Sequence, residues 1–154
     1  MPRTAGTSAN FNGSDLESFV ENILIRKGYT FVDKKKFEAT RYLEQPIYSK
    51  QFYIGRSIYD TSMYCDLILY HPEKFPDSLV IEVKWQQASG SVDEKFPFLV
   101  LNIKTRESYP TVILLDGGGY KAQAEKWLKN QIDGKLIHVF SMREFQTWAN
   151  KENI

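Results

Sequence analysis

The chain has 154 residues, of which 42% are hydrophobic, 25% are charged and 14% are aromatic, and its formal net charge is +1. This length suits one domain with a buried core, and the apolar content excludes a wholly disordered chain. The balanced charge excludes a general positive field for nucleic acid, so any attraction to phosphate must come from a local patch.

The first predicted element is a helix that begins near Ser14, after a small, polar segment (residues 1–12) predicted to be flexible. Ser14 and Glu17 have the spacing of a capping box, and Gly28 suits the position just after a helix. Apolar residues between these ends recur at helical intervals: Leu16, Phe19, Val20, Ile23 and Leu24.

Strands are predicted next. A short strand over 29–32 precedes a turn with three lysines (34–36), and apolar or alternating runs over 46–54 and 63–71 predict a hairpin. Two prolines mark the following turn before a strand over 78–85.

The C-terminal part alternates helices with strands. A helix is predicted over about 94–104, with Pro97 in its first turn, and a buried strand follows over 111–115. Three glycines then precede a helix that ends near Gly134, a strand over 136–140 and a last helix capped by Ser141 and Glu144. A strand meander that continues into strand–helix–strand crossovers predicts an α/β fold, namely one mixed sheet with helices on both faces, in a single domain over 13–150.

Cysteine content and hydropathy suggest an intracellular protein. The single Cys65 cannot form an internal disulfide, and the Cys and His residues lack zinc-site spacing. The N-terminus has no apolar signal region, and no apolar stretch reaches the length of a membrane span, so we expect a protein that is neither secreted nor membrane-spanning.

Candidate chemistry lies in the strands at 63–71 and 78–85. Because side chains alternate across a strand, Glu82, Lys84 and Gln86 share one face, and Leu79, Ile81, Val83 and Trp85 share the other. Asp66 lies in an otherwise apolar strand, where an unpaired carboxylate would be costly to bury. If Asp66 faces the same volume as Glu82 and Lys84, the three suit a divalent metal and a phosphodiester. Taken alone, Glu82 and Lys84 are better explained as an exposed ion pair on a solvated strand face.

The order of these residues resembles the motif of the PD-(D/E)XK nuclease superfamily, also called the restriction-endonuclease-like fold. In that motif one strand carries an acid, here Asp66, and the next carries an acid, any residue and a lysine, here Glu82, Val83 and Lys84. The proline that usually precedes the first acid is replaced by Cys65. The resemblance implies an αβββαβ core with C-terminal helix–strand–helix additions. It also implies a site in which Asp66, Glu82 and the Val83 carbonyl bind Mg²⁺, with Mn²⁺ as a substitute, and Lys84 assists the attacking water.

Three further side chains are candidates for the same site. Glu17 is placed like a helix-borne metal ligand of the superfamily, although the capping box explains it equally well, and Glu21 is a weaker candidate. Gln86 could hold the water or a phosphate oxygen, or could simply end a strand. The three glycines 117–119 lack the sequence of a phosphate-binding loop and are better explained by a strand-to-helix turn.

A basic hairpin and a small polar loop are the predicted DNA contacts. A solvated surface is the alternative for both. The residues are Lys34, Lys35, Lys36, Arg41, Lys50, Arg56, Ser89 and Ser91.

The resemblance implies a Mg²⁺-dependent DNA endonuclease, with restriction-type double-strand cleavage as the first hypothesis, and cleavage of both strands suggests a homodimer. A junction resolvase, a homing endonuclease and a repair nuclease of the same fold are the alternatives. A non-catalytic nucleic-acid-binding module and a partner-binding subunit are alternatives from other functional classes.

Overall fold

The computed structural model describes residues 11–90 and 92–154. Within them the chain forms a six-stranded mixed sheet in the order β1-β2-β3-β4-β5-β6. The strands are β1 (Thr30–Phe31), β2 (Ile47–Arg56), β3 (Ser62–His71), β4 (Phe75–Trp85), β5 (Thr111–Asp116) and β6 (Leu136–Phe140). The helices are α1 (Gly13–Arg26), α2 (Phe37–Thr40), η1 (Arg41–Leu43), η2 (Asp93–Lys95), α3 (Phe96–Thr105), α4 (Ala122–Lys129), α5 (Met142–Trp148) and η3 (Ala149–Asn153).

Among the described strands only β3 runs opposite to the others, and β1 pairs with β2 in parallel fashion. Strands β2, β3 and β4 pair in antiparallel fashion, whereas β4, β5 and β6 are parallel and are connected through α3 and α4. The predicted mixed α/β architecture is therefore confirmed. The short helices α2 and η1 were not predicted, because four residues of α2 carry too little helical periodicity to be distinguished from a turn.

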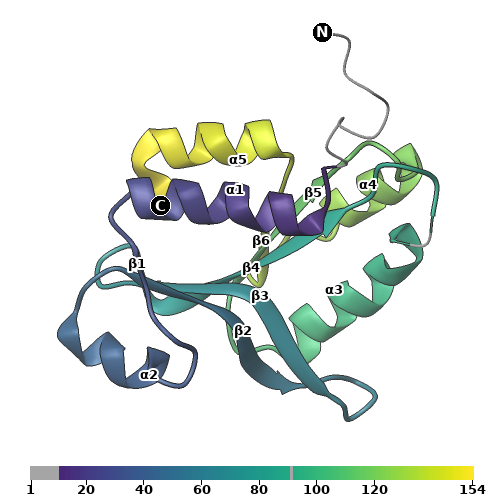
Figure 1. Ribbon diagram of the computed structural model, residues 1–154. Helices are drawn as coiled ribbons and strands as arrows, with labels where there is room; N and C mark the ends of the chain where they lie inside the picture. Colours follow the sequence, from purple (N-terminus) through teal and green to yellow (C-terminus); the bar gives the residue numbers. More distant parts are fainter. Residues whose placement is uncertain (1–10, 91) are drawn as a thin grey trace, which may run out of the picture.

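Helices cover both faces of the sheet, as Figure 1 shows. On one face α1 and α5 bury a core that includes Leu16, Leu67, Leu79 and Phe145. On the other face α3 and α4 cover one apolar cluster, and α2 covers a second cluster over the β2–β3 hairpin. In the described ranges no helix has the length and apolarity needed to cross a membrane.

The start of α1 differs from the prediction. Asn12 is the N-cap: its Oδ1 accepts a hydrogen bond from the Asp15 amide at 3.0 Å, and Asp15 Oδ2 accepts one from the Asn12 amide at 2.8 Å. The predicted capping box of Ser14 and Glu17 was therefore wrong. An asparagine caps as well as a serine, and Asp15 returns the bond that a Glu would have supplied. Glu17 therefore does not cap α1.

The predicted flexible segment 1–12 lies outside the described residues except at its end. There Asn12 caps α1, and the Phe11 ring lies 4.6 Å from the Trp85 ring, measured between centroids. This contact connects the start of α1 to the end of β4, the two elements on which Glu17 and Lys84 lie.

Candidate active site

Strands β3 and β4 pair only along part of their length. Their ladder runs from His71 and Phe75 to Leu67 and Ile81, after which β4 continues beside β5 as far as Trp85. We call the place where they separate the fork and define it by Asp66 of β3 and Glu82–Lys84 of β4. In Figure 1 the β2–β3 hairpin extends away from the β4–β6 part of the sheet beyond this point.

The fork coincides with a change of face in β2 and β3. Leu67 packs in the core under α1, whereas Cys65, two residues away, packs in the cluster under α2. Opposite Asp66, Gln51 of β2 has a left-handed φ of 51°, an uncommon conformation outside glycine. The regular alternation of side chains is thus interrupted at Asp66, which turns its carboxylate toward β4 instead of toward either core.

The Asp66 side chain replaces a backbone carbonyl as the hydrogen-bond partner of β4. Its Oδ2 accepts a hydrogen bond from the Val83 amide at 2.7 Å, so a side chain satisfies a backbone donor that has left the β3 ladder. This bond places the Asp66 carboxylate beside Glu82, whose side chain lies on the face opposite Ile81 and Val83. The alternation predicted for β4 is confirmed, because Leu79, Ile81 and Val83 lie in the core under α1.

Glu82 lies beside Asp66 and lines the same cavity as Lys84, so the charges of these groups affect one another. Glu82 is only 6% exposed. Burial raises its pKa well above the usual value, the charge of Asp66 and a hydrogen bond to Asp66 raise it further, and Lys84 lowers it. Two carboxyl groups so close together favour the neutral form of one of them, unless a cation neutralises the pair.

Glu17 reaches the same volume from α1. Burial raises the pKa of Glu17, Asp66 adds to the rise, and Lys50 and Lys84 oppose it. Its Oε1 is buried without a hydrogen-bond partner among the described residues. A buried carboxylate oxygen with no donor is costly, and a bound cation would remove that cost.

Glu21, one turn further along α1, is satisfied by its neighbours. One of its carboxylate oxygens accepts a hydrogen bond from the Tyr48 hydroxyl at 3.0 Å, and the other forms an ion pair with Lys50 Nζ at 2.6 Å. The two predicted glutamates therefore differ: Glu21 is already partnered, and Glu17 is not. Lys50, predicted as a DNA contact, instead lies with these two acids at the α1 side of the fork.

The donor set fits a hard divalent cation. In residues 11–90 and 92–154 no three acidic, histidine or cysteine side chains are close enough to surround one ion. Mg²⁺ typically takes one or two carboxylates and keeps several waters, so the pair of Asp66 and Glu82 is a sufficient protein contribution. Among the described residues, Glu17 lies near this pair with an unpartnered oxygen, but it does not form a three-acid cluster with Asp66 and Glu82.

A cleft of about 290 Å³ opens beside the fork. It lies between the β2–β3 hairpin and α3, and we call it the aromatic cleft. Its lining consists of Ile54, Met63, Tyr64, Glu82, Lys84, Lys95, Phe98, Leu99, Asn102 and Glu107. Most of these side chains were not predicted, because the hairpin and α3 are distant in sequence and no short motif relates them. Tyr64 precedes Asp66 by two residues, which is the one local signal that was available.

Gln86 points away from this cleft. Its Nε2 donates to the Gly119 carbonyl at 3.0 Å, and its Oε1 accepts from the Val92 amide at 2.8 Å. The side chain therefore joins the loop after β4 to the glycine loop after β5. Its predicted catalytic role stays a prediction, and its observed contacts are those of a positioning residue.

Close packing explains Gly117 and Gly119, and a left-handed φ of 76° explains Gly118. A Cβ added at Gly117 or Gly119 would lie 2.4 Å from the Gln86 carbonyl oxygen or 2.6 Å from that of Ala88. Only glycine allows the two loops to approach so closely. This agrees with the strand-to-helix turn preferred in the sequence, and it fixes the end of β4 that carries Lys84.

The predicted DNA contacts fall in several places. Lys34, Lys35 and Lys36 form an exposed turn before α2, and Lys34 Nζ lies 5.8 Å from the centroid of the Tyr64 ring. Arg56 pairs with Asp60 at 2.6 Å in the hairpin turn, and Ser89 is exposed in the loop after β4. Ser91 lies outside the described residues.

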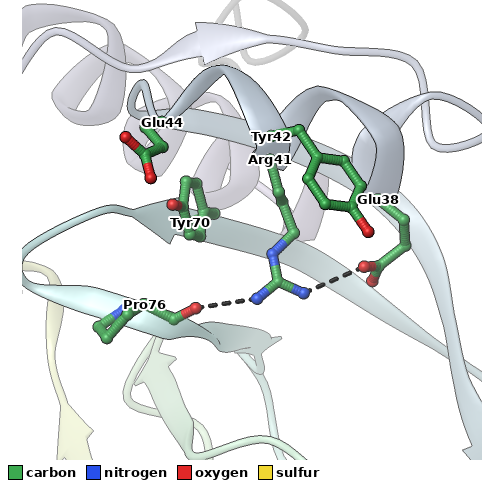
Figure 2. A pocket seen from close by; sticks show the side chains of 6 residues that line it. All are labelled: Glu38, Arg41, Tyr42, Glu44, Tyr70 and Pro76. Carbon is green, nitrogen blue, oxygen red and sulfur yellow. Dashed lines mark hydrogen bonds and ion pairs between the residues drawn. The ribbon is translucent and has the colours of Figure 1, made fainter.

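Arg41 occupies a separate pocket, shown in Figure 2. Its guanidinium donates to Glu38 at 3.0 Å and to the Pro76 carbonyl at 2.9 Å, and it lies over the Tyr70 ring. Glu44 also lines this pocket, so two carboxylates oppose the approach of a phosphate there. The structure gives Arg41 contacts that join η1 to β4, and its predicted role in DNA binding stays untested.

The comparison with known families agrees with this geometry. A sequence model described as a PD-(D/E)XK nuclease superfamily domain matches residues 8–153. The chain belongs to the PD-(D/E)XK nuclease superfamily. No curated protein and no solved structure matches the chain. The resemblance inferred from Asp66, Glu82 and Lys84 is thus confirmed, and a nuclease domain implies a nucleic-acid substrate.

Proposed function

We propose that this PD-(D/E)XK domain is a metal-dependent endodeoxyribonuclease that hydrolyses phosphodiester bonds with Mg²⁺, for which Mn²⁺ can substitute. The observation that carries the proposal is the hydrogen bond from the Val83 amide to Asp66. It holds one carboxylate of β3 beside Glu82 and Lys84 of β4 at the point where the strands separate.

Asp66, Glu82 and the Val83 carbonyl are the proposed metal ligands, and Glu17 is a proposed further ligand whose side chain would approach the cation when it binds. One oxygen of Asp66 accepts the Val83 amide, which leaves the other oxygen for a cation. When bound, the cation would neutralise charge on the phosphate and lower the pKa of the attacking water. The raised pKa values of Glu17 and Glu82 support the proposal, because both carboxylates gain from a nearby positive charge.

Lys84 is the proposed catalytic cation. It lines the aromatic cleft beside Glu82, so its ammonium can donate hydrogen bonds to the attacking water and to a phosphate oxygen. Lys50 keeps the Glu21 carboxylate neutralised on the α1 side and so limits the negative charge around Glu17. Gln86 holds the end of β4 in position through its bonds to two loops.

Double-strand cleavage needs two such sites. One domain carries one fork, so restriction-type cleavage of a duplex requires a homodimer with two-fold symmetry. The lysine turn at 34–36 and Ser89 are the proposed phosphate contacts, together with Ser91. Arg41, Arg56 and Lys50 pair with acids of the same chain and are weaker candidates for this role.

A cleavage assay tests the proposal. Purified protein is incubated with supercoiled plasmid and with labelled oligonucleotides in Mg²⁺, Mn²⁺, Ca²⁺ or EDTA, beside the variant Lys84→Ala. We expect endonucleolytic products in Mg²⁺ and Mn²⁺, none in EDTA, and a rate about 10²- to 10³-fold lower from the variant. Cleavage that persists in EDTA, or that proceeds at the wild-type rate in Lys84→Ala, would overturn the proposed site. DNA binding without cleavage of any substrate would instead favour a non-catalytic binding module.

A further inference from the structure

The aromatic cleft has the composition of a nucleobase pocket. The hairpin contributes Ile54, Met63 and Tyr64 to the lining, and α3 contributes Phe98, Leu99 and Asn102. Glu82, Lys84, Lys95 and Glu107 add charged groups. Apolar and aromatic surface combined with several polar groups is typical of small-ligand sites, whereas the phosphates of a duplex need a polar, cationic surface. The side chains beside the proposed scissile phosphate thus suit the flat face of a base.

The hairpin turn is fixed to α3 by two contacts. The Tyr59 ring stacks on Phe98 with centroids 5.1 Å apart and an interplanar angle of 24°. The Ile58 amide donates to Asn102 Oδ1 at 2.9 Å. These contacts set the position of the hairpin relative to α3, the two elements between which the cleft lies.

A second aromatic surface continues from the cleft toward the lysine turn. Tyr53 and Tyr64 form an edge-to-face pair with centroids 5.8 Å apart, and both are about half exposed (48% and 55%). Tyr64 lines the aromatic cleft on one side and, on the other, a shallow hollow shared with Lys34, Lys35 and Phe52. Cations and exposed aromatic rings alternate along this path, as they do on surfaces that bind single-stranded nucleic acid.

We infer that the aromatic cleft receives an unpaired nucleobase next to the scissile phosphate, so that the preferred substrate has unpaired nucleotides at the cleavage point. The inference rests on the proposed function. In this proposal a base enters the cleft beside Phe98 and Tyr64, its phosphate lies against Lys84 and Lys95, and the neighbouring strand crosses Tyr53 toward the lysine turn. A base in an intact duplex is stacked and paired, so it must first be extruded at a cost of a few kcal/mol.

The test measures binding and cleavage separately. Dissociation constants are measured by fluorescence anisotropy with a labelled single strand and a labelled duplex, in Ca²⁺ to limit cleavage. Cleavage in Mg²⁺ is compared for a continuous duplex, a single strand and a forked duplex. Stacking on one aromatic ring contributes enough that Tyr64→Ala and Phe98→Ala should each weaken single-strand binding about 5- to 100-fold.

Two control variants distinguish stacking from a general loss of structure. Tyr64→Phe keeps the ring and should retain the wild-type affinity. Tyr42→Ala removes an 88% exposed tyrosine that lines the pocket of Arg41 instead, and it should also bind as the wild type does. Melting temperatures of all variants show whether each one folds.

Each outcome decides the inference. Preference for the single strand or fork, lost in Tyr64→Ala and kept in Tyr64→Phe, supports it. A continuous duplex that is cleaved faster than the fork, with no effect of Tyr64→Ala or Phe98→Ala, overturns it and leaves the proposed nuclease intact. If no substrate is cleaved while single-strand binding still depends on Tyr64, the proposed chemistry fails and the base-binding cleft stands.

Discussion

Two neighbouring regions of β3 and β4 perform opposite tasks. In the paired segment (Leu67–Leu69 with Leu79–Ile81) each side chain is fully buried in an apolar cluster. The fork begins one residue further along each strand, where the polar groups of Asp66, Glu82 and Lys84 lie close together. Some of their hydrogen-bonding atoms have no partner among the described residues. The same pair of strands thus first supplies stability and then, where the ladder ends, supplies reactive groups.

The two regions differ in the groups that accept hydrogen bonds from the backbone amides of β4. In the paired segment, backbone amides bond to backbone carbonyls, whereas at the fork the Val83 amide bonds to the Asp66 carboxylate. That exchange marks the point at which the β3–β4 ladder ends. Stability and function are therefore separable by mutation, although the two regions are adjacent.

The largest effect is expected at Lys84. Lys84→Ala should lower the rate of phosphodiester cleavage about 10²- to 10³-fold, because removal of one positioned donor at developing charge has this effect in other hydrolases. Single-turnover cleavage in Mg²⁺ measures it. The melting temperature should change little, since Lys84 is half-buried at the mouth of the cleft. If Lys84→Ala lowered the melting temperature as severely as a core mutation does, the fork and the paired segment would not have separate roles in function and stability.

The converse variant lies in the paired segment. Leu69→Ala should lower the free energy of unfolding by about 2–5 kcal/mol, because it leaves a cavity at a fully buried position. Urea denaturation followed by circular dichroism measures the loss. Below the unfolding transition, the folded fraction should cleave at the wild-type rate. A large fall in that rate would mean that the geometry of the fork depends on the packing of Leu69, which would contradict the separation of the two regions.

A comparison within α1 sharpens the assignment of metal ligands. Glu17→Gln should weaken the apparent affinity for Mn²⁺ by about 10- to 100-fold, a size typical of losing one supporting group at a metal site. Glu21→Gln should mainly affect stability, by about 1 kcal/mol, because its partners are Tyr48 and Lys50. Metal titrations of cleavage rate distinguish the two variants. Equal affinities for Mn²⁺ would exclude Glu17 as a ligand.

The smallest effect concerns pH. Because burial raises the pKa of Glu82 in the folded state, the folded protein binds an extra proton above the ordinary value of 4.5. Stability from this group is thus present at low pH and is lost as the pH rises through the folded pKa. In EDTA, Glu82→Gln should therefore become progressively more stable than the wild type as pH increases. Urea denaturation over a pH series measures the difference, and a constant difference would contradict a buried, proton-binding Glu82.

Local patterns predicted the strands, the sheet class and the motif. Period-two alternation correctly assigned the two faces of β4, and Glu82 and Lys84 share one as expected. The cap of α1 was assigned to the wrong residues because Ser14 with Glu17 and Asn12 with Asp15 satisfy the same local rule, and only coordinates distinguish them.

The remaining features depend on contacts between distant segments. The partners of Lys50, Arg41 and Gln86 come from other elements, and no spacing in the sequence reveals that these side chains already have bonds. The aromatic cleft likewise depends on how the hairpin meets α3. The sequence could place the acids on their strands, but it could not show which polar groups are left without partners.

A calorimetric titration with Mn²⁺ tests the central claim most directly. Wild-type protein and Glu82→Gln are compared at neutral pH, each bound to an uncleavable phosphorothioate single strand. If Asp66 and Glu82 hold the cation at the fork, the wild type should bind Mn²⁺ and the variant should bind it at least about ten-fold more weakly. Equal binding by both proteins would contradict a metal site at the fork.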